Sequence, residues 1–175
     1  TSTSYISNFG LKSNYNLFFK NHNSLGKKSE TRSSPEVDFV GLFEASSSLP
    51  LIKNNKDYKN YLTPKISFRV NPIGMKDNST LSRTIDVGNV FSTNRLGLGS
   101  TSEAGRSLTL GLDFKIEKEI IKDDVEANLE DVNKFFEIKL ATVLRDKEEE
   151  FIPTTSTLNQ KTSNIFGSIT NELHD

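Results

Sequence analysis

The residue types that most often carry catalysis are scarce in this chain of 175 residues. It has no cysteine and two histidines, His22 in a polar stretch and His174 beside the last residue. Thiolate chemistry is therefore excluded for these residues, and neither a Ser-His-Asp triad nor a histidine metal site has support. We expect a protein that is not an enzyme and holds no cofactor.

Two further patterns could carry chemistry but do so weakly. Asp123-Asp124 and Glu148-Glu149-Glu150 offer carboxylates to divalent cations, although acidic runs are usually solvated surface. Gly97-Leu98-Gly99 lacks the third glycine and the strand-then-helix context of a dinucleotide-binding loop, which favours a turn. We predict no catalytic or metal site.

The remaining charges follow a period of two, which is typical of β-strands. In the segment 61–71 one face is apolar and the other polar, and in 105–116 the same alternation returns. The apolar positions are Leu62, Pro64, Ile66, Phe68, Val70, Leu108, Leu110, Leu112, Phe114 and Ile116. Pro64 cannot donate to a strand ladder, so it fits a strand start or a weakened pairing.

Four more segments, 8–20, 37–45, 136–145 and 165–169, predict an all-β protein with about six strands. In 37–45 both faces are partly apolar, because Val40 and Leu42 lie opposite Phe39 and Phe43. Either this strand contacts a plug or partner on its second face, or a register shift or bulge breaks the pattern.

Composition agrees with strands that face water on one side. The hydrophobic fraction is 34%, low for a compact globule, and the net charge of -1 gives no reason to expect nucleic acid. No run approaches the roughly 20 apolar residues of a membrane helix. Because the chain starts at Thr1 without an initiator Met or a signal peptide, we interpret residues 1–175 as a fragment of a longer protein.

Motifs between Tyr61 and Gly167 resemble a known family. They comprise Leu62-x-Pro64, Arg69, Pro72, Phe91, Asn94-Arg95, Gly99, Glu103, Gly105-Arg106 and Gly111-Leu112, then Phe136-Glu137-Ile138, Arg145-Asp146, Pro153, Ser156-Thr157-Leu158 and Ser163. This set resembles the middle of the barrel domain of the LPS-assembly protein LptD (organic solvent tolerance protein). The chain departs from that pattern at Gly99-Ser100-Thr101, where family members often have Asp-Arg after the glycine.

The resemblance implies antiparallel up-and-down strands of a transmembrane β-barrel, without the periplasmic N-terminal domain. It implies an integral protein of the Gram-negative outer membrane, part of the translocon that assembles lipopolysaccharide into the outer leaflet. Implied partners are lipopolysaccharide, outer-membrane lipid, an LptE-like lipoprotein plug and the periplasmic Lpt bridge. The alternatives are another porin-like barrel or a soluble carbohydrate-binding β-sandwich.

Three groups of site residues follow from this interpretation. The lumen-facing candidates are Lys65, Arg69, Asp113, Lys115, Glu137, Lys139 and Arg145. The lipid-facing candidates are Leu62, Ile66, Phe68, Leu110, Leu112, Phe114, Ile138 and Leu140. The family-motif loop contributes Asn94, Arg95, Gly99, Glu103, Gly105 and Arg106.

Strand alternation also predicts the topology of the connections. We expect an ordered loop over 72–105 at the cell surface above the barrel mouth, together with the loops 21–35 and 147–164. The connections 47–60 and 118–133 would face the periplasm, and the acidic segment 118–133 could form a turn or two of helix.

Overall fold

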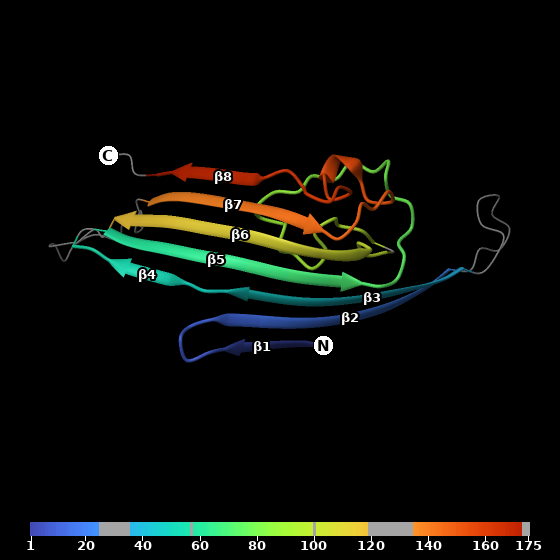
Figure 1. Ribbon diagram of the computed structural model, residues 1–175, viewed down its shortest axis with the longest axis horizontal. Helices are drawn as coiled ribbons and strands as arrows, with labels where there is room; N and C mark the ends of the chain where they lie inside the picture. The colour runs from blue at the N-terminus through green and yellow to red at the C-terminus, as the bar shows by residue number, and fades with distance from the viewer. Residues whose placement is uncertain (25–35, 57, 100, 119–134, 173–175) are drawn as a thin grey trace, which may run out of the picture.

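The protein is an open antiparallel β-sheet in which neighbouring strands run up and down (Figure 1). The computed structural model describes residues 1–24, 36–56, 58–99, 101–118 and 135–172. The elements are β1 Ser2–Ile6, β2 Lys12–Ser24, β3 Glu36–Ser48, β4 Leu51–Asn54, β5 Tyr58–Asn71, β6 Gly105–Lys118, β7 Phe135–Arg145, the 3-10 turn η1 Thr154–Ser156, and β8 Phe166–Asn171. The prediction of an all-β, antiparallel, up-and-down fold is confirmed.

The predicted number of strands is wrong, because the described residues form eight strands rather than about six. β1 is rich in hydroxyl side chains and lacks apolar alternation, yet it pairs with β2 from Ser2↔Asn16 to Ile6↔Lys12. β4 is four residues long and pairs with the first part of β5. Both strands form because their backbone groups find partners in a neighbouring ladder.

Pro64 lies where the sheet is interrupted. β3 ends at Ser48, β4 begins at Leu51, and in the gap the Leu49 amide donates to the Pro64 carbonyl at 3.1 Å. The nitrogen and the carbonyl of one strand residue point to the same neighbouring strand, so the N–H that proline lacks would face this gap. The proline is tolerated because no continuous ladder requires its donor.

The sheet has two chemically different faces, which we call the inner and outer faces. Ser67 pairs with Thr109 and Thr109 with Val143 on the inner face, while Ile66 pairs with Leu110 on the outer face. Ser67 is 1% and Thr109 0% exposed, whereas Ile66 is 44% and Leu110 38% exposed. At this level of the sheet the polar face is covered and the apolar face is open, the reverse of a soluble sheet packed on a core.

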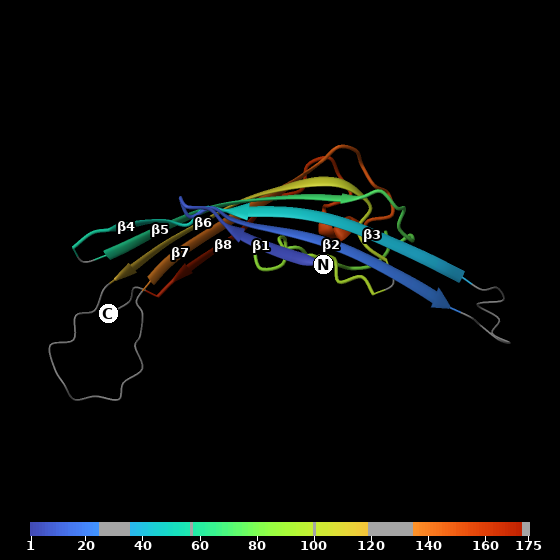
Figure 2. The ribbon, with the colours of Figure 1, turned by 90° about the horizontal axis from the view of Figure 1, so that it is seen from below.

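One end of the inner face is covered by two loops, the β5–β6 loop (72–104) and the β7–β8 loop (146–165). Figure 2 shows the sheet bent into an arch, with much of the β5–β6 loop on the inside of the curve. The two loops are joined by backbone bonds, for example from the Asn78 amide to the Phe151 carbonyl at 3.0 Å. A small apolar core lies between them and β7: Met75, Ile85, Val90, Leu96, Leu98, Ala104, Ala141, Val143, Ile152 and Leu158.

These loops also explain the two apolar faces of β3. Val40 and Leu42 are buried on the inner face, and the pairing of β2 with β3 runs without a bulge from Lys12↔Ser48 to Ser24↔Glu36. The proposed register shift is therefore wrong. The chain's own β5–β6 loop contacts this second face, since Thr93 Oγ1 donates to Glu44 Oε1 at 3.3 Å, and Leu98 lines the same pocket as Val40 and Leu42.

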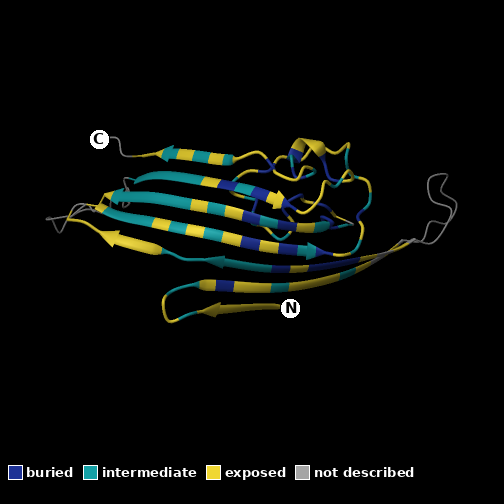
Figure 3. Ribbon diagram, in the orientation of Figure 1, coloured by how far each residue is buried: buried dark blue, intermediate teal, exposed yellow. Residues whose placement is uncertain are grey.

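Burial is concentrated at one end of the sheet (Figure 3). The β5–β6 and β7–β8 loops leave the sheet at this end, and the turns β1–β2 and β4–β5 lie at the opposite end. The predicted grouping is confirmed for three connections, 72–105 and 147–164 at one end and 47–60 at the other. The sequence pattern did not predict the β1–β2 turn. The residues 25–35 and 119–134, and with them the predicted helical turns, lie outside the described part of the chain.

Candidate functional site: a charged cluster between the sheet and its loop

Four adjacent strands bring polar side chains into one row on the inner face. Glu44 of β3 lies opposite Arg69 of β5, Arg69 opposite Ser107 of β6, and Ser107 opposite Arg145 of β7. Each residue is at an inner position of its strand, so strand register alone makes them neighbours. The β5–β6 loop adds Arg95 and Glu103, and we call these five charged residues the charged cluster.

Glu103 is at the centre of the charged cluster. Its carboxylate accepts from Arg95 Nε at 2.7 Å and from Arg95 Nη2 at 2.5 Å, and it also accepts from Arg145 Nη1. Arg95 in turn donates to Thr109 Oγ1 at 2.9 Å and to Ser107 Oγ at 3.0 Å. One loop carboxylate thus connects the loop with β6 and β7 through two arginines.

Arg69 and Glu44 hold an earlier part of the loop. Arg69 donates to the carbonyls of Ser92, at 3.2 Å, and of Thr93, and its Nε lies 3.4 Å from Glu44 Oε2. Glu44 accepts from Thr93 Oγ1 at 3.3 Å and from Asn16 Nδ2 at 3.0 Å. Every contact in this set joins a strand of the sheet to the loop or to a neighbouring strand, so the charged cluster acts as a clamp that holds the β5–β6 loop on the sheet.

All five charged side chains are buried, and this makes the pairing necessary. Burial by itself would raise the pKa of the Glu103 carboxyl, but the guanidinium groups of Arg95, Arg69 and Arg145 lower that pKa to about 2. Glu103 is therefore ionised at neutral pH. Three arginines against two glutamates leave one positive charge in excess.

Two glycines of β6 allow neighbouring side chains to approach this strand closely. Gly105 has φ +83, and a side chain there would begin 2.9 Å from Arg145 Nη2. The ring of Phe91 packs directly against Gly111, and a Cβ added at Gly111 would lie 2.6 Å from Phe91 Cζ. Phe91 is also 5.7 Å from Lys65 Nζ, a cation–π geometry.

The structure places the seven lumen-facing candidates on the inner face but divides them into two groups. Arg69 and Arg145 belong to the buried charged cluster. The other five are half-buried in the uncovered half of the sheet, where Lys65 pairs with Asp113, Lys139 with Glu137 at 2.8 Å, and Lys115 with Glu117 at 2.5 Å. Several of these residues line an open cavity of about 340 Å³.

The eight lipid-facing candidates all lie on the outer face. Leu62, Ile66, Phe68, Leu110, Leu112 and Leu140 are exposed, and Phe114 and Ile138 are half-buried. The register aligns them across β5, β6 and β7, for example Leu62↔Phe114↔Ile138 and Pro64↔Leu112↔Leu140. They form a continuous apolar surface, which Phe43 of β3 and Leu17 of β2 extend.

The family-motif residues have separate roles in the structure. Arg95 and Glu103 belong to the charged cluster, and Gly105 allows Arg145 to approach. Asn94 closes a local turn, since its Oδ1 accepts from the Leu98 amide at 3.0 Å and its Nδ2 donates to the Leu98 carbonyl at 3.1 Å. Arg106 is exposed and Gly99 lines an apolar pocket.

Sequence reasoning missed Glu44 and Asn71. Asn71 is buried and donates to the carbonyls of Ser102 and Glu103 at 3.3 and 3.1 Å. Glu44 could have been found, because it is a carboxylate on the same face of its strand as the apolar Val40 and Leu42. A charge on a face that apolar residues mark as covered requires a buried partner.

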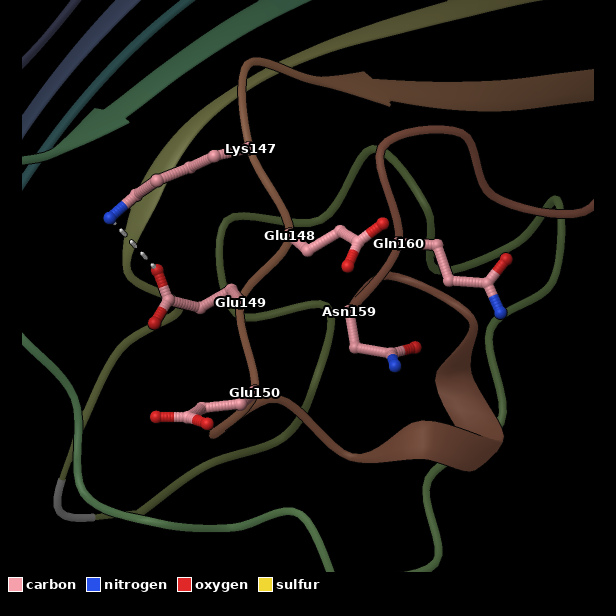
Figure 4. A pocket seen from close by; sticks show the side chains of 6 residues that line it. All are labelled: Lys147, Glu148, Glu149, Glu150, Asn159 and Gln160. Atoms are coloured by element: carbon pink, nitrogen blue, oxygen red, sulfur yellow. Dashed lines mark ion pairs between the residues drawn. The ribbon is translucent and has the colours of Figure 1, made fainter.

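The acidic run in the β7–β8 loop does not form a metal site. Glu148, Glu149 and Glu150 line an open pocket of about 680 Å³ with Asn159 and Gln160 (Figure 4). The carboxylate of Glu148 points away from those of Glu149 and Glu150, and Glu149 pairs with Lys147 at 3.8 Å. Within the described residues no group of three or more acidic, histidine or cysteine side chains could hold a metal ion.

No family model, no curated protein and no solved structure matches the chain. In the described ranges no helix is long and apolar enough to cross a bilayer.

Proposed function

We propose that the chain forms part of the wall of a transmembrane β-barrel in an outer membrane. The observation that carries this proposal is the reversed polarity of the sheet, with a polar inner face under loops and an exposed apolar outer face. Monomeric soluble proteins rarely expose apolar patches larger than a few hundred Å². The outer surface of a bacterial barrel is apolar and its interior polar, and loops often fold into that interior.

Closure of such a barrel requires further strands beside β1 and β8, which are at the two edges of the described sheet. Within a bilayer an unpaired strand edge has no water to satisfy its backbone groups. We propose that strands from elsewhere in the protein pair with both edges.

Within this class we propose a role in lipopolysaccharide assembly. The uncovered half of the inner face alternates positive and negative side chains, among them Lys65, Asp113, Lys115 and Glu137, so it can hydrogen-bond sugars and pair with phosphates. The motif residues Arg95, Glu103 and Arg145, on which the resemblance to LptD partly rests, form the clamp of the inward loop. In this proposal the saccharide part passes along the polar face, and the molecule leaves between the first and last strands of the complete barrel.

A porin-like channel is the second candidate, because a charged interior with an inward loop suits a pore for small solutes equally well. A depletion experiment separates the two functions. In cells that make the complete protein, its conditional depletion should lower the amount of pulse-labelled lipopolysaccharide that reaches the outer leaflet. Undiminished lipopolysaccharide delivery together with slower uptake of small solutes would refute the assembly role and support the porin-like channel.

A further inference from the structure

One part of the inner face is apolar although its surroundings are polar. Phe18 of β2, Val40 and Leu42 of β3, and Leu98 and Gly99 of the β5–β6 loop line a pocket of about 330 Å³. We call it the inner-face pocket. The remaining lining residues are polar: Lys20, Thr93, Asn94, Thr101 and Ser102.

The pocket is built from fixed elements. Phe18 lies directly opposite Leu42, and Lys20 opposite Val40, so two adjacent strands provide its floor. The Asn94 side chain holds Leu98 through two hydrogen bonds, and Lys20 Nζ donates to the Gly99 carbonyl at 2.5 Å. The loop thus encloses one side of the pocket without filling it.

Two observations indicate that the pocket has room for a ligand. Phe18 is 44% exposed although its side chain lies on the inner face. In a barrel, membrane lipid does not reach this face and so does not cover the exposed ring. A Cβ added at Gly99 would meet nothing within 4 Å, so the loop leaves open space beside this glycine. A cavity of this size lined by apolar groups with a few polar groups at its edge is typical of small-molecule sites.

We propose that the inner-face pocket binds the alkyl chain of an anionic single-chain amphiphile. The apolar lining accommodates the hydrocarbon, and each methylene removed from water contributes about 0.8 kcal/mol. The charge at the mouth selects the head group. Lys20 borders the pocket, and Thr93 connects it to the charged cluster, which has one positive charge in excess, so an anionic head is favoured over a neutral one.

This proposal does not depend on lipopolysaccharide assembly. It requires only that the inner face be reachable by a small amphiphile, which holds for a channel as well. Its failure would leave the barrel and the assembly role untouched, and failure of the assembly role would leave the pocket intact.

Photo-crosslinking of the complete protein in lipid nanodiscs tests the site. The probes are a long-chain fatty acid and a lysophosphatidic acid, each with a diazirine in the chain, and the same chain ending in an alcohol. We expect both anionic probes to label peptides containing Leu42 and Leu98 saturably, and the alcohol to label them about tenfold less. The stronger of the two anionic probes identifies the head group, carboxylate or phosphate.

Gly99→Val adds a branched side chain at the lining of the pocket and should lower saturable labelling about tenfold, which corresponds to ~1.4 kcal/mol. Gly74→Val is the matched control, because Gly74 is in the same loop and an added Cβ there also meets nothing within 4 Å. Labelling of outer-face peptides containing Leu112 should stay non-saturable and equal in all variants. Labelling of Leu42 and Leu98 that is absent, non-saturable or unchanged by Gly99→Val would overturn the proposal, as would protection of these peptides by a co-purifying polypeptide.

Discussion

Removal of the Glu103 carboxylate should release the β5–β6 loop from the sheet. Glu103→Ala leaves Arg95 and Arg145 buried without the carboxylate that both contact. Breaking a buried ion pair by removing one partner typically costs about 3–5 kcal/mol, because the remaining charge stays desolvated. Two arginines lose their partner here, so we expect a cost of at least about 3 kcal/mol.

This cost should appear in local opening of the loop rather than in loss of the whole sheet. The β5–β6 pairing continues from Tyr58↔Lys118 to Asn71↔Gly105 without help from Glu103. At ~1.4 kcal/mol per factor of ten, a loss of about 3 kcal/mol accelerates amide hydrogen exchange in the loop more than 100-fold. Exchange at the Leu98 amide, read by mass spectrometry or NMR on the complete protein, measures it directly.

Two variants make the result interpretable. Glu103→Gln keeps the shape of the side chain but removes its charge, so it should accelerate exchange by an intermediate amount. Glu150→Gln, at an exposed position of the β7–β8 loop, should change exchange less than about threefold. Loop exchange in Glu103→Ala within threefold of the unsubstituted protein would refute the clamp.

The remaining predictions concern pH, packing and the outer face. The pKa of Glu103 is lowered from 4.5 to about 2, so the stability that this carboxylate contributes is complete above pH 4.5 and is lost as pH falls towards 2. Protection of the loop amides from hydrogen exchange, corrected for intrinsic exchange, should therefore be constant from pH 7 to 5 and decline below pH 4.5. Gly111→Ala should destabilise the loop by about 1–3 kcal/mol by displacing the Phe91 ring, and adding Phe91→Ala should remove most of that effect in a double-mutant cycle. Leu112→Arg should block membrane assembly, because an arginine on the lipid-facing side near the midplane destabilises a barrel by about 2–4 kcal/mol. Thr63→Arg should assemble, because Thr63 lies at the same level of the sheet but on the inner face, opposite Asp113. Equal assembly of these two variants would contradict the orientation of the sheet.

The fold class followed from the period-two alternation because sheet pleating fixes the direction of every second side chain. The alternation in 61–71 and 105–116 identified β5 and β6 and sorted their residues correctly between the two faces. It could not identify β1, whose serines and threonine carry no apolar pattern. β1 exists because its backbone pairs with β2, and this information is not local to the segment.

The charged cluster was only partly predictable from the sequence. The motif residues marked Arg95 and Glu103, and the alternation marked Arg69 and Arg145. No local pattern, however, joins Glu103 of the loop to Arg145, which is 42 residues further along the chain. Alternation alone places Thr109 on the polar inner face, where a substitution by arginine would be expected to be tolerated. The structure buries it against Arg95, so a large charged side chain does not fit there.

The most direct test of the central claim is whether the outer face contacts lipid and the inner face contacts water. Residues 1–175 contain no cysteine, so Leu112→Cys and Thr63→Cys each add a single spin-label site to this part of the protein, and any cysteine elsewhere in the complete protein is first replaced by serine. In the complete protein in bilayers, the label at residue 112 should be relaxed strongly by oxygen and weakly by a water-soluble nickel chelate, and the label at residue 63 should show the opposite preference. A label at residue 112 that is either readily accessible to nickel or inaccessible to both reagents, as it would be when packed against a second sheet, would contradict the barrel wall.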